Sequence, residues 1–309
     1  MLKQLKNNLI WFINLLDKNF HLHIFPRDRI FSLDSNDLVI FKNRKLVLNT
    51  NRYGFDMFYF CCSFDYLNEH YFCFQASKLN KDLSHSSFIC IIDSKNNLVK
   101  KISAKELGFS SFSSLQVLVD DKPILYFCAD NNKQFSLYSL ILEDIGLYSK
   151  PTLLRRDIFQ FSIFSFKNKF IIIYKKSNDT SLNAVKTADF LHFSDWKLNL
   201  ITAEDFVFID NPSIVQNDST IHLFCRISHH SALESNIISF TSSDAHTFNQ
   251  SSVRLLPLHN RYERHSTAFP FVTTFDGKFR LYYTAYWGFH LLNKLTIKRW
   301  VNNKRSSGK

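Results

Sequence analysis

The sequence predicts an all-β fold, a single five-bladed β-propeller, for most of this chain. The first observation is a short motif, Ser/Thr-x-Asp-x-x-x-aromatic, that recurs along the 309 residues. The second is composition: 33 Phe and 12 Tyr favour strands, and a hydrophobic content of 45% excludes global disorder. A β-sandwich or two smaller β domains are the alternatives.

The motif recurs at the spacing of propeller blades. Its Asp residues are separated by 56, 51, 45 and 55 residues, about the length of one four-stranded blade. Three copies match fully, a fourth keeps the Asp and the aromatic, and a fifth is degraded. In that order they are Ser35–Phe41, Thr187–Phe193, Ser242–Phe248, 142–148 and 92–98. Five copies predict five blades.

Each copy of the motif should perform a structural task. We expect the Asp side chain to accept backbone N–H bonds within a turn. We expect the aromatic residue to pack between neighbouring blades. The repeated aspartates are therefore not candidates for catalysis.

The two ends of the repeat complete each other. The last unit, which begins at Pro270, has no Asp copy after it, and the first copy, at Asp37, has no unit before it. The N-terminal strand that carries Asp37 should therefore join the last blade and close the ring, which removes open sheet edges. The expected organisation is an N-terminal helical segment and lead-in at 1–28, the propeller at 29–300, and a basic C-terminal tail at 301–309.

The first residues, Met1–Leu16, combine a basic start with a short apolar centre, as a signal peptide does. No small-residue cleavage site follows, and the apolar stretch is too short to span a bilayer. We interpret the segment as a short amphipathic helix packed on the domain. Attachment to a membrane surface and an atypical signal peptide are the alternatives.

The positions of the cysteines indicate the cellular compartment to expect, and the net charge indicates which binding partners to expect. The six cysteines lie in apolar, strand-like runs without zinc-type spacing, which indicates reduced core thiols in a cytoplasmic protein; a disulfide between strands is the alternative. We expect neither a metal nor another cofactor. The net charge of +11 is scattered apart from the stretch Lys294–Lys309, so no specific nucleic-acid partner is expected. The cysteines are Cys61, Cys62, Cys73, Cys90, Cys128 and Cys225.

The stretch from Asn211 to Phe248 resembles the β-mannoside phosphorylases. It contains an asparagine-proline strand, a second strand that ends at Arg226, and a serine-aspartate turn in which Ala245 replaces the usual glycine. As blade architecture, the resemblance extends over 35–290 to the five-bladed carbohydrate-active enzymes, which include arabinanases, β-xylosidases, invertases and levansucrases. Sialidase-like propellers carry a related turn and are less similar. The resemblance implies a carbohydrate substrate or ligand in a central funnel, lined by the N-terminal ends of the innermost strands.

Three aspartates before expected inner strands, Asp56, Asp157 and Asp210, are the candidate catalytic residues. Glycoside cleavage needs one acid to protonate the leaving oxygen and a second carboxylate as base or nucleophile. The resemblance implies that the first-blade Asp is base or nucleophile, that the third-blade Asp orients or stabilises, and that the fourth blade supplies the acid. Asp210 stands where a Glu is usual, and Ile158 stands where the invertases carry the proline of Arg-Asp-Pro.

Five residues near these aspartates are candidate substrate-binding residues. Arg226 lies on a strand that should be buried, so it needs an acidic partner or a ligand. The other four flank expected strand starts: Asn211, Arg264, His265 and Arg156.

These features favour a carbohydrate-active propeller that cleaves or transfers a glycosidic bond, as a glycoside hydrolase or a glycoside phosphorylase does. The alternative is a non-catalytic propeller that binds a glycan or a protein, in surface-polysaccharide metabolism for example. Two carboxylates across an open funnel would favour catalysis, whereas a plugged funnel would favour scaffolding.

Overall fold

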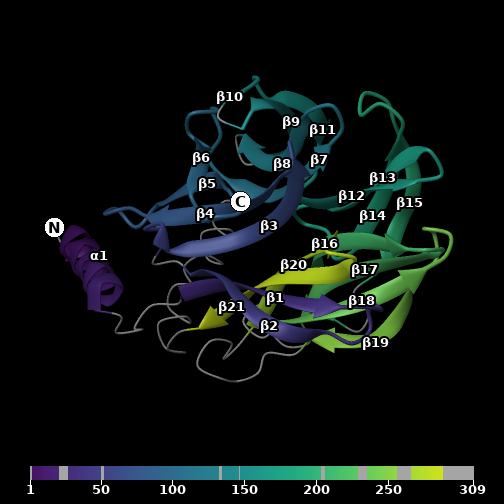
Figure 1. Ribbon diagram of the computed structural model, residues 1–309. Coiled ribbons are helices and arrows are strands. Elements are labelled where there is room, and N and C mark those ends of the chain that lie inside the picture. The colour runs from purple at the N-terminus through teal and green to yellow at the C-terminus, as the bar shows by residue number, and fades with distance from the viewer. Residues whose placement is uncertain are drawn as a thin grey trace.

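The described residues form five antiparallel sheets around a common centre, so the predicted five-bladed β-propeller is confirmed (Figure 1). The computed structural model describes residues 2–20, 27–49, 52–131, 134–145, 147–202, 206–228, 235–255 and 266–287. In each blade the strands follow one another outwards from the centre, and successive strands pair antiparallel.

The blades take their strands in chain order, except at the ends of the chain. Blade 1 contains β3 (Met57–Tyr66), β4 (Glu69–Leu79), β5 (His85–Ile92) and β6 (Leu98–Ser103). Blade 2 contains β7 (Phe112–Val119), β8 (Pro123–Asn131) and β9 (Gln134–Asp144), with β10 (Leu147–Tyr148) and β11 (Thr152–Arg156) both paired to β9. Blade 3 contains β12 (Gln160–Phe166), β13 (Lys169–Lys175), β14 (Leu182–Thr187) and β15 (Phe193–Ile201). Blade 4 contains β16 (Phe208–Asn217), β17 (Thr220–Ser228), β18 (Asn236–Ser242) and β19 (Asn249–Leu255).

Blade 5 closes the ring as the sequence predicts. Its inner strands are β20 (Ser266–Phe275) and β21 (Lys278–Trp287), and its outer strands are β1 (Arg27–Ser35) and β2 (Lys42–Asn49). Strand β1 pairs with β21 along its whole length, from Arg27 opposite Trp287 to Ser35 opposite Phe279. The N-terminal strand therefore covers the edge that β21 would otherwise expose.

Side chains of the inner strands link each blade to the next. The Gln116 amide of β7 donates to the Ile163 carbonyl oxygen of β12 and accepts from the Ile163 N–H, at 2.8 and 2.9 Å. Ser213 of β16 accepts from the Val272 N–H of β20 at 2.9 Å. Because buried polar groups need partners, these bonds fix the inner strands relative to one another.

The repeated motif forms the turn that the sequence predicts. The Ser242 hydroxyl accepts from the N–H of Ala245, and Asp244 Oδ1 accepts from the N–H groups of His246 and Thr247, both at 2.8 Å. The turns at Asp37 and Asp189 repeat these bonds. In the degraded copy, Asp93 still accepts two backbone N–H bonds; the side chain of Asp144 lies outside the described residues.

The motif aromatic packs between blades, which confirms the second expectation. The ring of Phe41 meets Phe224 of blade 4 edge-on, with 5.8 Å between the ring centroids. Phe248 packs into the core between blades 3 and 4. The position after the Asp is left-handed in each full copy, with φ of 60° at Ala245, which explains why related turns use glycine there.

These turns should make the fold sensitive to acid. Hydrogen bonds from the Thr247 and His246 N–H groups lower the pKa of Asp244 from 3.8 to about 2. A carboxyl whose pKa is lower in the folded state stabilises the fold above its unfolded pKa, and this contribution is lost as the pH falls. We expect the free energy of unfolding, measured with urea, to fall between about pH 5 and pH 2, and to fall less in Asp244→Asn, which keeps the acceptor oxygen but does not titrate.

The matched control is Asp120→Asn, since Asp120 lies exposed in the β7–β8 turn. It should show the same acid dependence as the unmodified protein. Identical acid curves for Asp244→Asn and the unmodified protein would show that this turn does not carry the effect.

All six cysteines are buried and none forms a disulfide, which confirms the core thiols. Burial raises the pKa of the Cys90 thiol to about 12.

The N-terminal helix is α1 (Leu2–Phe20), and it lies beside the propeller at the N-terminal end of the chain (Figure 1). No described helix combines the length and apolar character needed to cross a membrane.

Candidate functional site

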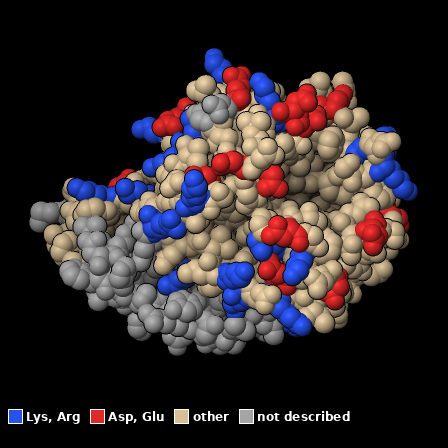
Figure 2. Space-filling view, viewed as in Figure 1, with Lys and Arg blue, Asp and Glu red and all other residues tan. Residues whose placement is uncertain are grey.

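The five inner strands surround a hollow at the centre of the propeller. Each contacts the next around the ring, from β3 through β7, β12, β16 and β20 back to β3. Figure 2 shows this hollow over the place where the inner strands meet in Figure 1, with acidic side chains on its rim. The candidate residues are therefore placed relative to this ring.

Asp210 and Arg226 form a buried ion pair on neighbouring strands of blade 4. Arg226 Nε donates to Asp210 Oδ1 at 2.7 Å, and Nη2 donates to Oδ2 at 2.6 Å. The two side chains are 9% and 15% exposed, respectively. The partner that Arg226 requires on a buried strand is thus supplied within the same blade. Because both oxygens of Asp210 face the guanidinium, this carboxylate is better arranged to hold Arg226 than to donate a proton.

The guanidinium of Arg226 also lies over two aromatic rings. Its Cζ is 4.7 Å from the ring centroid of Phe208 and 5.5 Å from that of Phe269, which belongs to β20. Phe269 in turn meets Tyr59 of β3 edge-on, with 5.6 Å between ring centroids. A continuous contact therefore runs from blade 4 through blade 5 to blade 1.

Asn211 adjoins this pair and has an unusual environment. It is 1% exposed, and neither its Oδ1 nor its Nδ2 has a hydrogen-bond partner in the protein. The register of β16 against β17 shifts between Asp210 and Ser213, and Asn211 has a left-handed φ of 52°. An amide that is buried without a partner is costly, so its retention indicates a task other than stability.

Asp157 lies in the connection between β11 and β12, where blade 3 begins. Its carboxylate is 51% exposed and is 3.6 Å from Lys176 Nζ. Lys175, which directly precedes Lys176, is buried. Its Nζ donates to the Ile209 carbonyl oxygen at 2.6 Å. Burial lowers the pKa of Lys175, and the Asp210 carboxylate raises it in part. Lys176 thus pairs with Asp157, and the neighbouring Lys175 lies near enough to Asp210 for the charge of that carboxylate to affect its pKa.

Asp56 stands immediately before β3, as predicted, and is 4% exposed. Its Oδ2 accepts from the Leu79 N–H at 2.7 Å. Burial raises the pKa of nearby Tyr59, and the negative charges of Asp28 and Asp56 add to this increase. Asp56 therefore lies near Tyr59, whose ring contacts Phe269 of blade 5.

Two findings refine the sequence-based placement. Strand β16 begins at Phe208, so Asp210 and Asn211 lie inside it rather than before it, and Arg156 is exposed at the end of β11. Arg264 and His265 lie outside the described residues. The sequence reasoning missed Lys175 and Phe269, because their apolar neighbours made them resemble ordinary core positions.

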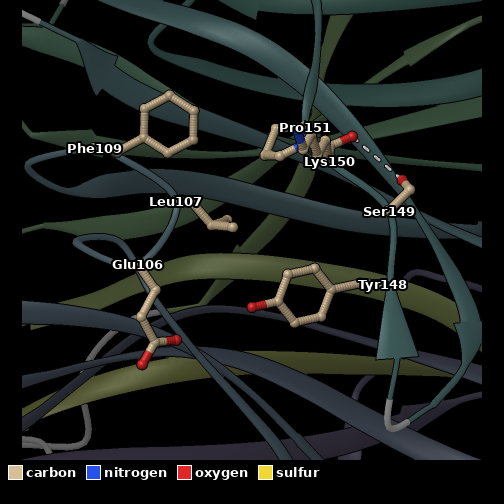
Figure 3. A pocket seen from close by; sticks show the side chains of 7 residues that line it. All are labelled: Glu106, Leu107, Phe109, Tyr148, Ser149, Lys150 and Pro151. Carbon is tan, nitrogen blue, oxygen red and sulfur yellow. Dashed lines mark hydrogen bonds between the residues drawn. The ribbon is translucent and has the colours of Figure 1, made fainter.

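A second hollow lies between the outer parts of blades 1 and 2. It has a volume of about 460 Å³, and Figure 3 shows the ring of Tyr148 and the side chain of Leu107 facing it. None of the candidate catalytic or substrate-binding residues predicted from the sequence lines it. The lining residues are Glu106, Leu107, Phe109, Tyr148, Ser149, Lys150 and Pro151.

Comparisons with known proteins show the fold alone. No protein-family model matches the sequence, and neither does any curated protein. Solved structures that share the fold include a glycosyl hydrolase from Bacteroides ovatus, with 13% identity, a TM-score of 0.56, and coverage of 75% of this chain and 84% of that one. A GH43_1 enzyme from Xanthomonas citri, solved with xylotriose, has 8% identity, a TM-score of 0.54, and coverage of 74% and 87%. A GH32 β-fructofuranosidase from Bombyx mori has 10% identity, a TM-score of 0.54, and coverage of 72% and 53%.

Proposed function

We propose that this chain acts on a carbohydrate at the centre of the propeller and cleaves or transfers a glycosidic bond. The proposal is supported by the fold it shares with glycoside hydrolases and by the charged and aromatic side chains that contact one another from blade 4 through blade 5 to blade 1. A protein that binds sugars needs polar groups for the hydroxyls and apolar surface for the ring faces. The contacting side chains of Asp210, Arg226, Phe269 and Tyr59 provide both.

We assign the reacting carboxylates to Asp56 and Asp157, which lie on different blades. One would protonate the leaving oxygen, and the other would act as base or nucleophile. Asp210 is assigned a positioning role, because its two oxygens hold the Arg226 guanidinium. This differs from the acid role that the resemblance implies for the fourth-blade position.

The observation that carries the proposal is the buried, unpartnered amide of Asn211. A side-chain amide donates and accepts, as a sugar hydroxyl does, so the two can exchange both kinds of hydrogen bond. Asn211 adjoins Asp210, so a sugar held by this amide would lie beside the Arg226 ion pair.

The non-catalytic alternative has its own supporting observation. Asp210, the expected acid, is committed to an ion pair, and a propeller whose fourth-blade carboxylate does not donate a proton could bind a glycan and leave it intact. Experiments can distinguish the catalytic function from the non-catalytic one, because both require sugar binding and only the catalytic function requires turnover.

Binding is tested with Asn211→Gly and a panel of xylose, fructose, mannose and their oligosaccharides. Glycine removes the amide and tolerates the left-handed backbone, whereas alanine would add strain. We expect about tenfold weaker binding of the preferred sugar by ligand-observed NMR, the loss expected for one or two hydrogen bonds.

The matched control is Asn168→Gly. Asn168 is also left-handed, with φ of 60°, but it lies exposed in the β12–β13 turn. It should bind like the unmodified protein. If Asn211→Gly and Asn168→Gly bind the sugar equally well, Asn211 does not contact it.

A further inference from the structure

Helix α1 has an apolar stripe that faces away from the protein. Leu5, Leu9 and Phe12 are 69%, 58% and 50% exposed, and they lie three or four residues apart, so they share one face of the helix. Exposed Leu and Phe side chains are normal singly, but a contiguous stripe on one helix marks an interaction surface.

The orientation of α1 explains why this stripe lacks a partner in the propeller. Trp11, on the opposite side of the helix from Leu9, lies under the Lys81 ammonium of the β4–β5 turn, with 5.1 Å between Nζ and the ring centroid. Figure 1 shows α1 beside this end of blade 1 rather than over a blade face. The expectation that the helix packs its apolar side on the domain is therefore not met at Leu5, Leu9 and Phe12.

The charge of the segment indicates what covers the stripe. The helix sequence contains three lysines, at 3, 6 and 18, and one acidic residue, at 17. By helical period, positions 3, 6 and 18 fall outside the apolar stripe. The whole chain carries a net charge of +11. An apolar face on a helix with a net positive charge suits the surface of an anionic membrane, where apolar side chains reach the acyl chains and the positive charge is attracted to the lipid headgroups.

We infer that α1 binds in the plane of an anionic lipid surface, with Leu5, Leu9 and Phe12 inserted among the acyl chains. The propeller would then be held at the membrane surface through α1. This inference is independent of the function proposed for the centre of the ring.

Vesicle flotation of the full chain tests the inference. The probes are phosphatidylcholine vesicles and vesicles of phosphatidylcholine and phosphatidylserine in equal amounts. We expect binding to the anionic vesicles that decreases with salt, and binding about a hundredfold weaker when Leu5, Leu9 and Phe12 are all changed to serine.

The control variant changes three equally exposed leucines of the propeller to serine. Leu67, Leu147 and Leu191 are 76%, 64% and 72% exposed and lie away from α1 in the sequence. This variant should bind vesicles like the unmodified protein, and both variants should unfold at the same urea concentration. The inference is overturned if the unmodified chain binds neither vesicle, if it binds both equally, or if the helix variant binds as well as the control. A concentration-dependent dimer that only the helix variant loses would also overturn it, in favour of a second copy as the occupant.

Discussion

Replacing Arg226 with methionine is expected to lower the free energy of unfolding by about 3–5 kcal/mol. The substitution leaves the Asp210 carboxylate buried without the two charge-assisted hydrogen bonds that it accepts from the guanidinium. Methionine keeps much of the apolar length of arginine, so contacts with Phe208 and Phe269 are retained in part. Urea unfolding at neutral pH provides the measurement.

Two comparisons make this result specific to the buried pair. Lys176→Met removes an exposed partner of Asp157, where both side chains are about half exposed, and should cost less than about 1 kcal/mol. The double variant Asp210→Leu with Arg226→Met should recover much of the lost stability, because two apolar side chains can replace a buried ion pair. If Arg226→Met costs no more than Lys176→Met, the ion pair does not stabilise the region as described.

The largest expected functional effect is the loss of turnover in Asp56→Asn. If Asp56 is the base or nucleophile, kcat on the preferred glycoside should fall by a factor of about 10²–10⁴, with KM much less affected. Asparagine keeps an oxygen that can accept from the Leu79 N–H, so the fold should be preserved. Asp157→Asn should lower turnover by a comparable factor.

Asp121→Asn is the matched control for turnover, since Asp121 lies exposed in the β7–β8 turn. It should keep full activity. A glycoside that the unmodified protein and all three variants turn over equally would contradict the assignment of Asp56 and Asp157. Sugar binding without turnover in the unmodified protein would instead favour the non-catalytic alternative.

The propeller architecture was predictable because it depends on short sequence motifs and on the spacing between them. The turn around Asp244 needs only residues within one motif, so its hydrogen bonds follow from the sequence. Ring closure followed from the unmatched ends of the repeat, at Asp37 and Pro270, although β20 begins earlier, at Ser266.

The central contacts were less predictable because they depend on register between distant segments. The pairing of Asp210 with Arg226 requires the register of β16 on β17, and the shift after Asp210 has no clear sequence signal apart from the following Pro212. The place of Lys175 beside Ile209 depends on how two blades meet. The direction of the apolar stripe on α1 likewise depends on which face meets Lys81.

A crystal structure of the protein soaked with its preferred sugar tests the central claim most directly. The proposal predicts a sugar ring at the centre of the inner strands, hydrogen-bonded to the Asn211 amide and within reach of Asp56 and Asp157. A sugar bound only in the outer hollow beside Tyr148, with the centre of the ring unchanged, would contradict it.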